Sequence, residues 1–196
     1  MFDNFLLLIK VFHIGDELTP MKLVAVEDGC RGIAFFQHSF ILGFRSPAPS
    51  VVRMSEEGKV LNTLRYDSSG EKLFSRPNYI HVENTSDSTR ILVSDSGKDT
   101  VYMLDDGLQL LQAFEFPSYG EPRGQAAVGG GQVLVLVVDS GTWTLQLLDL
   151  TMGRWRTLLG KEEGLGQPFS LVYNQALRQL YIGCKEDNVK VYTVSE

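Results

Sequence analysis

The sequence predicts an all-β fold of repeated antiparallel sheets, the architecture of a β-propeller, on the strength of three observations. The segment Ser94–Asp105 returns as Val138–Asp149, 44 residues later. Each copy contains apolar runs of about five or six residues, separated by Gly, Asp, Ser and Pro, which is typical of strands and turns. A repeat of about 40 to 50 residues is typical of propeller blades or helical arrays, and the strand-like runs favour blades.

Four residues mark the starts of the repeats. Pro77, Pro122 and Pro168 lie 45 and 46 residues apart, and Cys30 lies 47 residues before Pro77. Each of them precedes an apolar run, so we expect blades that open near residues 30, 77, 122 and 168. The chain 1–196 then forms a single partial propeller, in which residues 1–28 are the end of a preceding blade.

The strands within the blades follow from the apolar runs. In the blade that opens at Pro77 we expect strands at 78–83, 90–94, 99–104 and 108–115, with Asp105–Gly107 as the turn before the last one. In the blade that opens at Pro122 we expect later strands at 132–138, 143–148 and 154–159, with Gly129–Gly131 as the first turn.

The outer blades are less regular. The blade near Cys30 has runs at 33–36, 40–44, 51–54 and 60–64, with Pro47 and Pro49 in a connection that we expect to be a stiff surface loop, because proline cannot donate to a strand ladder. The last blade has runs only at 169–173, 180–184 and 189–194, and the runs at 5–12 and 21–26 match a third and a fourth strand.

Both ends therefore fall within a blade. The segment 21–26 can complete the last blade, which gives about four blades in a closed ring, at the low end of the known range. We favour instead a larger propeller that is truncated on its N-terminal side. Such an open arc exposes apolar faces and strand edges, through which self-association is possible.

Composition restricts the classes of partner. The net charge is -6, the isoelectric point is about 5.1, and no run of lysines or arginines occurs, which disfavours RNA or DNA but leaves a local basic patch possible. The apolar run Phe5–Ile9 is too short for a signal peptide or a membrane span. We interpret Cys30 and Cys184 as buried thiols in a reducing compartment, and a disulfide between them is the less favoured alternative. We therefore expect a cytoplasmic protein without a membrane partner.

The repeated Asp-Ser-Gly motif is the most prominent polar feature. Asp95 and Asp139 could bind a cation, but a feature that recurs in each blade is typical of architecture. We therefore expect each aspartate to cap its turn, while Gly97 and Gly141 adopt positive φ.

Catalytic chemistry is not indicated. Propeller enzymes of the lactonase type hold a metal through convergent acidic and amide oxygens. The candidates for such ligands are spread over separate turns: Glu83, Asn84, Asp95, Asp139 and Asn174. The three histidines have no nucleophile motif beside them, and the triple glycine lacks the context of a phosphate loop. We expect no enzyme activity, no cofactor and no metal.

Binding is expected on the loops between strands, where rigid scaffolds usually present it. The connections at 45–49, 66–76, 117–123 and 161–167 are the longest. Arginine and aromatic residues dominate the energetics of protein interfaces. The candidate partner-binding residues are therefore Arg76, Phe74, Tyr119 and Arg123.

Two patterns carry a resemblance to a known family. The run Ile91–Gly97 followed by Thr100–Asp105 resembles an NHL-type repeat. The ordered segments Gly29–Phe35, Asp67–Pro77 and Val93–Val101 look like the C-terminal region of invertebrate tripartite-motif (TRIM)-like proteins. This resemblance covers nearly the whole chain.

The resemblance implies a propeller truncated from six blades that recognises protein partners, or RNA in some members of the family. In that family a RING finger, B-boxes and a coiled coil precede the propeller. This chain has no zinc-ligand cluster of Cys and His and no heptad-patterned helix. Ubiquitin ligase activity is thus an expectation only for a longer parent protein.

Overall fold

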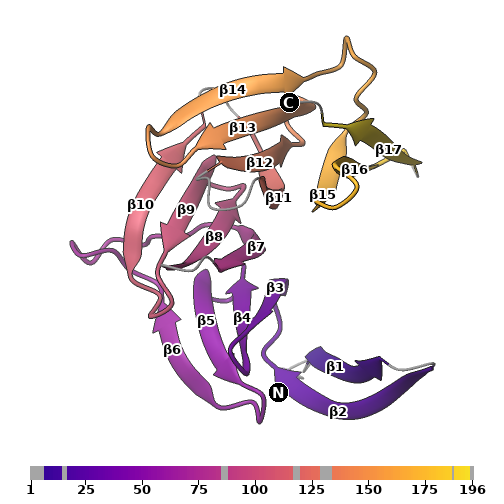
Figure 1. The fold of residues 1–196 in the computed structure, drawn as a ribbon. Coiled ribbons are helices and arrows are strands. Elements are labelled where there is room, and N and C mark those ends of the chain that lie inside the picture. The colour runs from indigo at the N-terminus through magenta and orange to yellow at the C-terminus, as the bar shows by residue number, and fades with distance from the viewer. Residues whose placement is uncertain are drawn as a thin grey trace.

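The computed structural model describes residues 7–14, 17–84, 88–116, 120–128, 134–186 and 188–194. These residues form five antiparallel sheets that follow one another along the chain (Figure 1). The prediction of an all-β fold with repeated sheets is confirmed. Within the described ranges there is no helix long and apolar enough to cross a membrane.

The sheets differ in strand number only at the two ends of the chain. The first is a hairpin of β1 (Leu7–Ile14) and β2 (Leu18–Val26). Three four-stranded sheets follow: β3 (Cys30–Phe36), β4 (Ser39–Phe44), β5 (Ser50–Ser55) and β6 (Val60–Leu64); β7 (Pro77–Asn84), β8 (Thr89–Asp95), β9 (Thr100–Leu104) and β10 (Leu110–Glu115); β11 (Pro122–Val128), β12 (Leu134–Asp139), β13 (Thr144–Asp149) and β14 (Arg154–Leu159). The last sheet has three strands: β15 (Pro168–Asn174), β16 (Gln179–Cys184) and β17 (Asn188–Thr193).

The sheets are arranged around an open arc. Figure 1 shows β7, β11 and β15 on the concave side and β6, β10 and β14 on the convex side. The first strands of neighbouring sheets contact one another: β3 with β7, β7 with β11, and β11 with β15. The hairpin β1–β2 and the sheet β15–β17 lie at the two ends of the arc, which is not closed.

The starts of the repeats occupy one register position. Each first strand begins at the residue that pairs with the last residue of the second strand: Cys30 with Phe44, Pro77 with Asp95, Pro122 with Asp139, and Pro168 with Cys184. A register shift follows each of these pairs. The first residue of a strand is a position where proline is tolerated, which explains why three of the four are proline.

The core consists of apolar layers between neighbouring sheets. Successive side chains of a strand point to opposite faces, so the buried β8 serves two layers. Ile91 and Val93 pack toward the sheet of β3–β6, and Leu92 packs toward the sheet of β11–β14. All three are fully buried. Burial on both faces is why these middle strands are continuous apolar runs rather than alternating ones.

The arc ends in uncovered apolar faces. Val24 and Val26 of the hairpin are buried against β4, but Leu8 and Leu23 on its other face are 50% and 61% exposed. At the other end of the arc, Val172, Val189 and Val191 are exposed. Among the described residues, the sheet at each end of the arc therefore has a neighbouring sheet on one side only.

Several local expectations are corrected. Gly97 and Gly141 do not have positive φ; Asp99 and Trp143, two residues further on, have φ of 50° and 61°. Glycine is required at 97 by close packing, because a Cβ there would lie 2.8 Å from Cβ of Ser75.

The strand predicted from residue 108 begins at Leu110 instead. Leu108 has φ of 63° and is buried in the turn. The turn predicted at Gly129–Gly131 lies outside the described residues. Cys30 and Cys184 are free thiols that are half-buried rather than buried.

Candidate functional site

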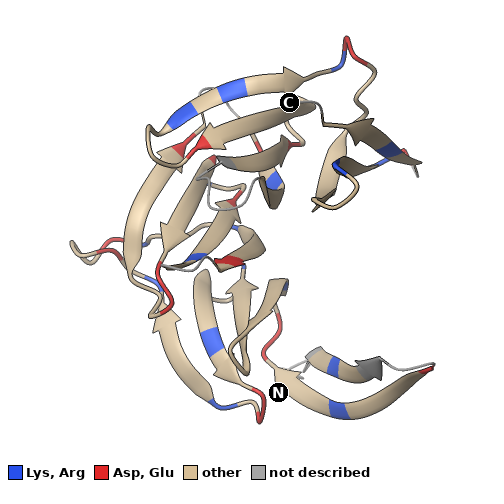
Figure 2. Ribbon diagram, viewed as in Figure 1, with Lys and Arg blue, Asp and Glu red and all other residues tan. Residues whose placement is uncertain are grey.

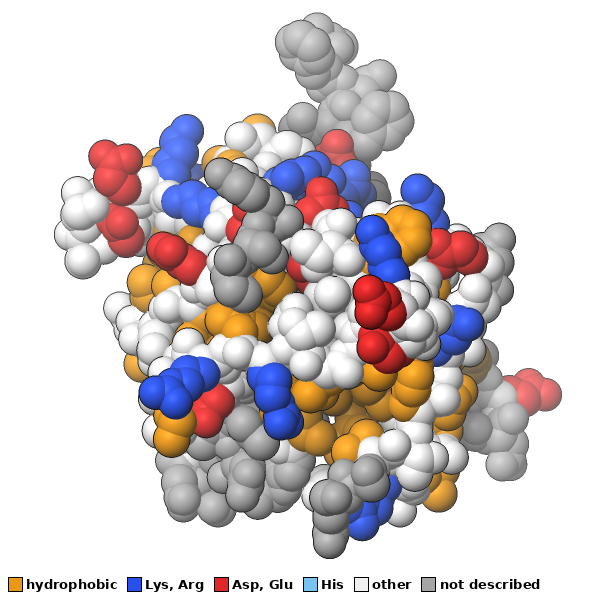
Figure 3. Space-filling model, turned by 90° about the horizontal axis from the view of Figure 1, so that it is seen from above, with side chains coloured by type: hydrophobic (Ala, Val, Ile, Leu, Met, Phe, Trp, Pro, Cys, Tyr) orange, Lys and Arg blue, Asp and Glu red, His pale blue; other side chains and the backbone are white. Residues whose placement is uncertain are grey.

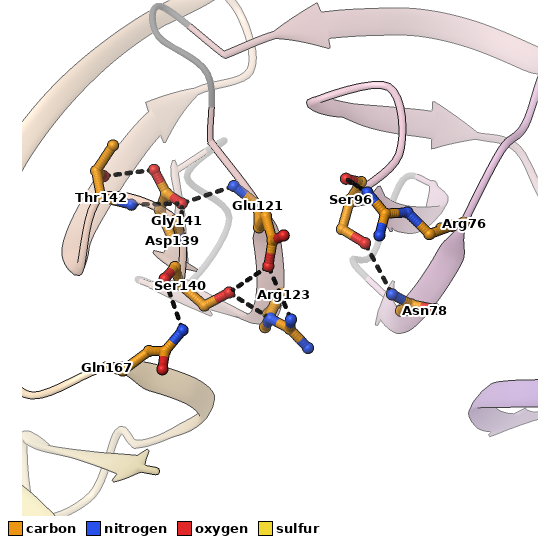
Figure 4. Close-up of polar contacts among 10 residues, drawn as sticks. All are labelled: Arg76, Asn78, Ser96, Glu121, Arg123, Asp139, Ser140, Gly141, Thr142 and Gln167. Carbon is orange, nitrogen blue, oxygen red and sulfur yellow. Dashed lines mark hydrogen bonds and ion pairs between the residues drawn. The ribbon is translucent and has the colours of Figure 1, made fainter.

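Polar side chains gather where the inner strands begin. The residues at the starts of β7, β11 and β15 lie beside the turns that follow β8 and β12, on the concave side of the arc, and Figure 4 shows side chains from this region. We call this set the polar rim, which comprises Arg76, Asn78, Ser96, Glu121, Arg123, Ser140 and Gln167.

Asp95 fixes the rim in the second repeat. Its side chain is fully buried, and it accepts backbone hydrogen bonds from Ser75 (2.7 Å), Arg76 (2.8 Å), Gly97 (2.9 Å) and Lys98 (3.2 Å). The first two donors precede β7 and the other two follow β8. The carboxylate of Asp95 therefore links the residues before β7 to the turn after β8.

Asp139 does the same in the next repeat. It accepts hydrogen bonds from the backbone N–H of Glu121 (2.7 Å) and Gly141 (2.8 Å), and from Oγ1 of Thr142 (2.6 Å). It too is fully buried. The interpretation of the Asp-Ser-Gly aspartates as turn caps is confirmed, and the structure extends it, because each aspartate also binds the strand entry.

Arg123 is the most firmly held side chain of the rim. Its Nη2 donates to Oε2 of Glu121 at 2.9 Å, and its Nε donates to Oγ of Ser140. The guanidinium carbon lies 4.3 Å from the ring centroid of Phe169 in the next sheet. The hydrogen bond from Arg123 lowers the pKa of Glu121 and keeps it ionised. The guanidinium group is thus held by contacts from two sheets, with 21% of its side chain exposed.

A smaller hydrogen-bond network lies at the equivalent position of the second repeat. Arg76 donates from Nη2 to the carbonyl of Ser96 at 3.0 Å, and Asn78 donates from Nδ2 to Oγ of Ser96 at 2.8 Å. Oδ1 of Asn78 is buried and has no hydrogen-bond partner among the described residues. The second repeat therefore places an arginine on the rim beside a buried acceptor.

The last sheet closes the rim on its far side. Gln167, which precedes β15, donates from Nε2 to the carbonyl of Ser140 at 3.1 Å. Its backbone N–H donates to Oε1 of Glu186 at 3.3 Å. Together with the stacking of Arg123 on Phe169, this contact makes the rim continuous across the third and the fourth repeat.

The electrostatics of the rim are mixed. Burial raises the pKa of Asp99, and the charge of Asp139 adds to this effect, while Arg76 opposes it. Figure 2 shows acidic and basic residues interspersed along the arc, with Lys and Arg spread over several sheets. The arginines of the rim thus lie among carboxylates rather than in a basic patch.

The structure brings together two of the four predicted partner-binding residues. Arg76 and Arg123 lie on the rim. Phe74, which was expected on an exposed loop, is buried and packs edge-on against Tyr102, with ring centroids 5.2 Å apart. Phe74 lies in a long connection between strands, but this connection folds back over the core. Tyr119 lies outside the described residues.

Sequence reasoning missed the other rim residues. They occupy equivalent repeat positions next to an opening proline or after a capping aspartate: Glu121 and Gln167 precede a proline, Asn78 follows one, and Ser96 and Ser140 follow the aspartates. An alignment of the repeats by their opening prolines is the signal that finds them.

The oxygen groups considered for a metal do not converge. Asp95 and Asp139 serve backbone donors, and Glu83 faces Arg90 across β7 and β8, with Oε2 and Nη1 3.9 Å apart. The described residues include no group of three or more His, Cys, Asp and Glu that could hold a metal ion.

Comparison with known proteins identifies the fold and no family. No family model and no curated protein matches the chain. Among solved structures, the computationally designed Ika4 protein has a TM-score of 0.60 at 15% identity, with 85% of this chain and 91% of that chain covered. A protein of unknown function from Bacteroides caccae has a TM-score of 0.61 at 18% identity, with 89% and 64% covered.

A third similar structure is that of BBS1N in complex with ARL6DN, with a TM-score of 0.63 at 13% identity and coverage of 89% of this chain and 52% of that chain. The chain therefore spans nearly all of the designed protein and about half to two thirds of the two others. At these identities the likeness concerns the fold alone.

Proposed function

We propose that this chain is a non-catalytic protein-recognition module that binds a partner through the polar rim. The observation that supports the proposal most strongly is the geometry of Arg123. Its guanidinium group is held by Glu121, Ser140 and Phe169, and 21% of the side chain is exposed. An arginine that is already ordered loses little side-chain entropy on binding, and arginine is enriched among the residues that dominate interface energies.

The chemistry of the rim indicates the partner group. Arg76 and Arg123 offer N–H donors in the planar arrangement that suits a carboxylate. We infer that the rim takes a peptide segment with a carboxylate. The intervening backbone of the inner strands provides a rigid base for this recognition.

The resemblance noted in the sequence suggests the larger context. We propose that the arc is part of a larger NHL-like propeller of the TRIM type, truncated from six blades, of which about four are represented here. In a longer parent protein it would select substrates for ubiquitin transfer. The similar structure of BBS1N in complex with ARL6DN is an example of this fold in a protein complex.

RNA is the alternative partner, and the rim favours it less. Glu121 lies within 2.9 Å of Arg123, so part of the positive charge is already neutralised. A phosphate backbone requires several clustered cations, and Figure 2 shows Lys and Arg spread over several sheets among Asp and Glu.

The proposal is tested by selecting peptides from a displayed random library on the purified protein. The affinities of the selected peptides are then measured by fluorescence polarisation. The variants Arg123→Ala and Arg123→Lys should each weaken binding by at least about tenfold, because lysine keeps the charge but loses the fork and the stacking. Arg154→Ala on the outer strand β14 is the matched control. Equal affinities for all variants, or selective binding of single-stranded RNA, would contradict the proposal.

A further inference from the structure

A pocket opens between the hairpin β1–β2 and the first four-stranded sheet. Its volume is about 270 Å³. A benzene ring fits an apolar cavity of about 150 Å³, so this pocket has room for a ring and several further atoms. Its walls come from β2, from β5 and β6, and from the loop between β4 and β5. Figure 3 shows the opposite end of the arc, where hydrophobic side chains reach the surface between charged ones, so the pocket lies away from that face.

The connections between sheets explain why the pocket opens here. Phe74 belongs to the apolar layer between the first and second four-stranded sheets, Phe116 to the next layer and Leu165 to the last, and each comes from the connection between its two sheets. The corresponding connection between β2 and β3 is Glu27–Gly29, which is short and contains no apolar side chain. The layer next to the hairpin therefore has no apolar cover of this kind.

Two side chains of the first four-stranded sheet are also smaller than their counterparts. In the following sheets, Tyr102 of β9 is buried, and Trp155 of β14 packs on Phe116 with ring centroids 4.2 Å apart. The residues at the same register positions of the first four-stranded sheet are Val52 and Val60. Both valines line the pocket. The space that a large aromatic side chain occupies in the other layers is thus open in this one.

Strands that precede β1 in a longer chain would leave this pocket in place. Figure 1 shows β1 on the concave side of β2, and β1 pairs with β2 along one edge. A further strand of that sheet would pair with the other edge of β1, on the side away from β2. Ile9 and Val11 of β1 pack in the buried layer, whereas the hairpin residues that line the pocket belong to β2 or follow it directly. The pocket therefore depends on two sheets that the structure describes.

The pocket combines an apolar interior with two opposite charges. Phe44, Val52 and Met54 line it and are buried. Glu27 and Arg65 also line it and are exposed, and they are the only charged side chains among the described residues of its wall. Neither side chain has an ion pair with another described residue. Both charges are therefore available to a ligand.

We propose that this pocket binds a free α-amino acid with an aromatic or large aliphatic side chain. The apolar side chain enters the pocket, the guanidinium group of Arg65 binds the carboxylate, and the carboxylate of Glu27 binds the ammonium group. A ligand with a single charge would leave one of these two side chains without a partner. Phenylalanine suits the volume, because its side chain is a benzene ring on one methylene group.

The pocket is separate from the polar rim. None of the rim residues is among the described residues that line the pocket. Arg123→Ala should therefore leave amino acid binding unchanged, and changes in the pocket should leave the rim unchanged. Failure of either proposal is distinguishable from failure of the other.

The first test compares three probes by isothermal titration calorimetry on the intact chain: L-phenylalanine, 3-phenylpropionate, which lacks the ammonium group, and phenethylamine, which lacks the carboxylate. We expect saturable binding of L-phenylalanine, with each singly charged probe bound about threefold to fivefold more weakly, the effect of one partly exposed ion pair. Arg65→Gln should bind L-phenylalanine as weakly as the unmodified chain binds phenethylamine. Glu27→Gln should bind it as weakly as the unmodified chain binds 3-phenylpropionate.

The second test fills the pocket. Val60→Trp places an indole at the register position of Trp155 and should weaken L-phenylalanine binding at least about tenfold, because the ligand ring loses its apolar contacts. Leu61→Trp is the matched control, since Val60 and Leu61 are 53% and 52% exposed but Leu61 does not line the pocket. Circular dichroism checks that both variants fold. No saturable binding of L-phenylalanine, equal affinities for the three probes, or unchanged binding by Val60→Trp would overturn the proposal.

Discussion

Replacing Asp95 by alanine should destabilise the fold strongly while changing no charged surface. The carboxylate is fully buried and accepts four backbone hydrogen bonds. A hydrogen bond to a charged acceptor contributes about 1.5 to 3 kcal/mol. The entry at Ser75 and Arg76 is partly exposed, so water can replace some of the lost partners. If the loss equals that of about two such bonds, the free energy of unfolding falls by about 3 kcal/mol.

The assay is urea denaturation followed by far-ultraviolet circular dichroism, with thermal melting as a second readout. For a chain of this length, about 3 kcal/mol lowers Tm by roughly 6 to 12 °C. Asp105→Ala is the control, since that side chain accepts a hydrogen bond from the backbone N–H of Gln109 and is partly exposed. A loss below about 1 kcal/mol at Asp95, or equal losses at both positions, would refute the view that this residue ties the repeat together.

Two further predictions concern Gly97 and the buried Glu83. Gly97→Ala should cost about 1 to 3 kcal/mol, because its Cβ would lie 2.8 Å from that of Ser75, and an unchanged urea midpoint would contradict this. Glu83→Gln should raise Tm at about pH 8, because burial raises the pKa of Glu83. The stabilising contribution of this carboxyl group is complete below its pKa in the unfolded chain and is lost as pH rises through its pKa in the folded state. The difference in Tm between the variant and the wild type should vanish below about pH 4. A wild type that is more stable than the variant at about pH 8 would contradict this prediction.

Much of the repeat architecture could be predicted because it is encoded locally. A proline at the start of a strand and an Asp-Ser-Gly turn after the next one leave direct marks in the sequence, as at Pro77 and Asp95. The buried middle strands are also recognisable, since burial on both faces requires continuous apolar runs. These signals do not depend on how the sheets pack together.

The remaining features depend on tertiary contacts that a single sequence does not reveal. Gly97 is glycine because Ser75 of another segment comes close, and not because of its own backbone conformation. Phe74 lies in a connection that folds over the core, so a loop position did not mean exposure. Arg123 was selected by residue type, and its contacts with Phe169 and Ser140, which come from other strands and turns, could not be predicted in this way.

The most direct test of partner recognition by the rim is hydrogen exchange on the complex with a library-selected peptide. The account predicts protection confined to the starts of β7, β11 and β15 and to the turns after β8 and β12. The variant Arg123→Ala should abolish that protection without altering exchange in the outer strands. Protection confined to β6, β10, β14 or β17 would contradict the assignment of the rim as the recognition surface.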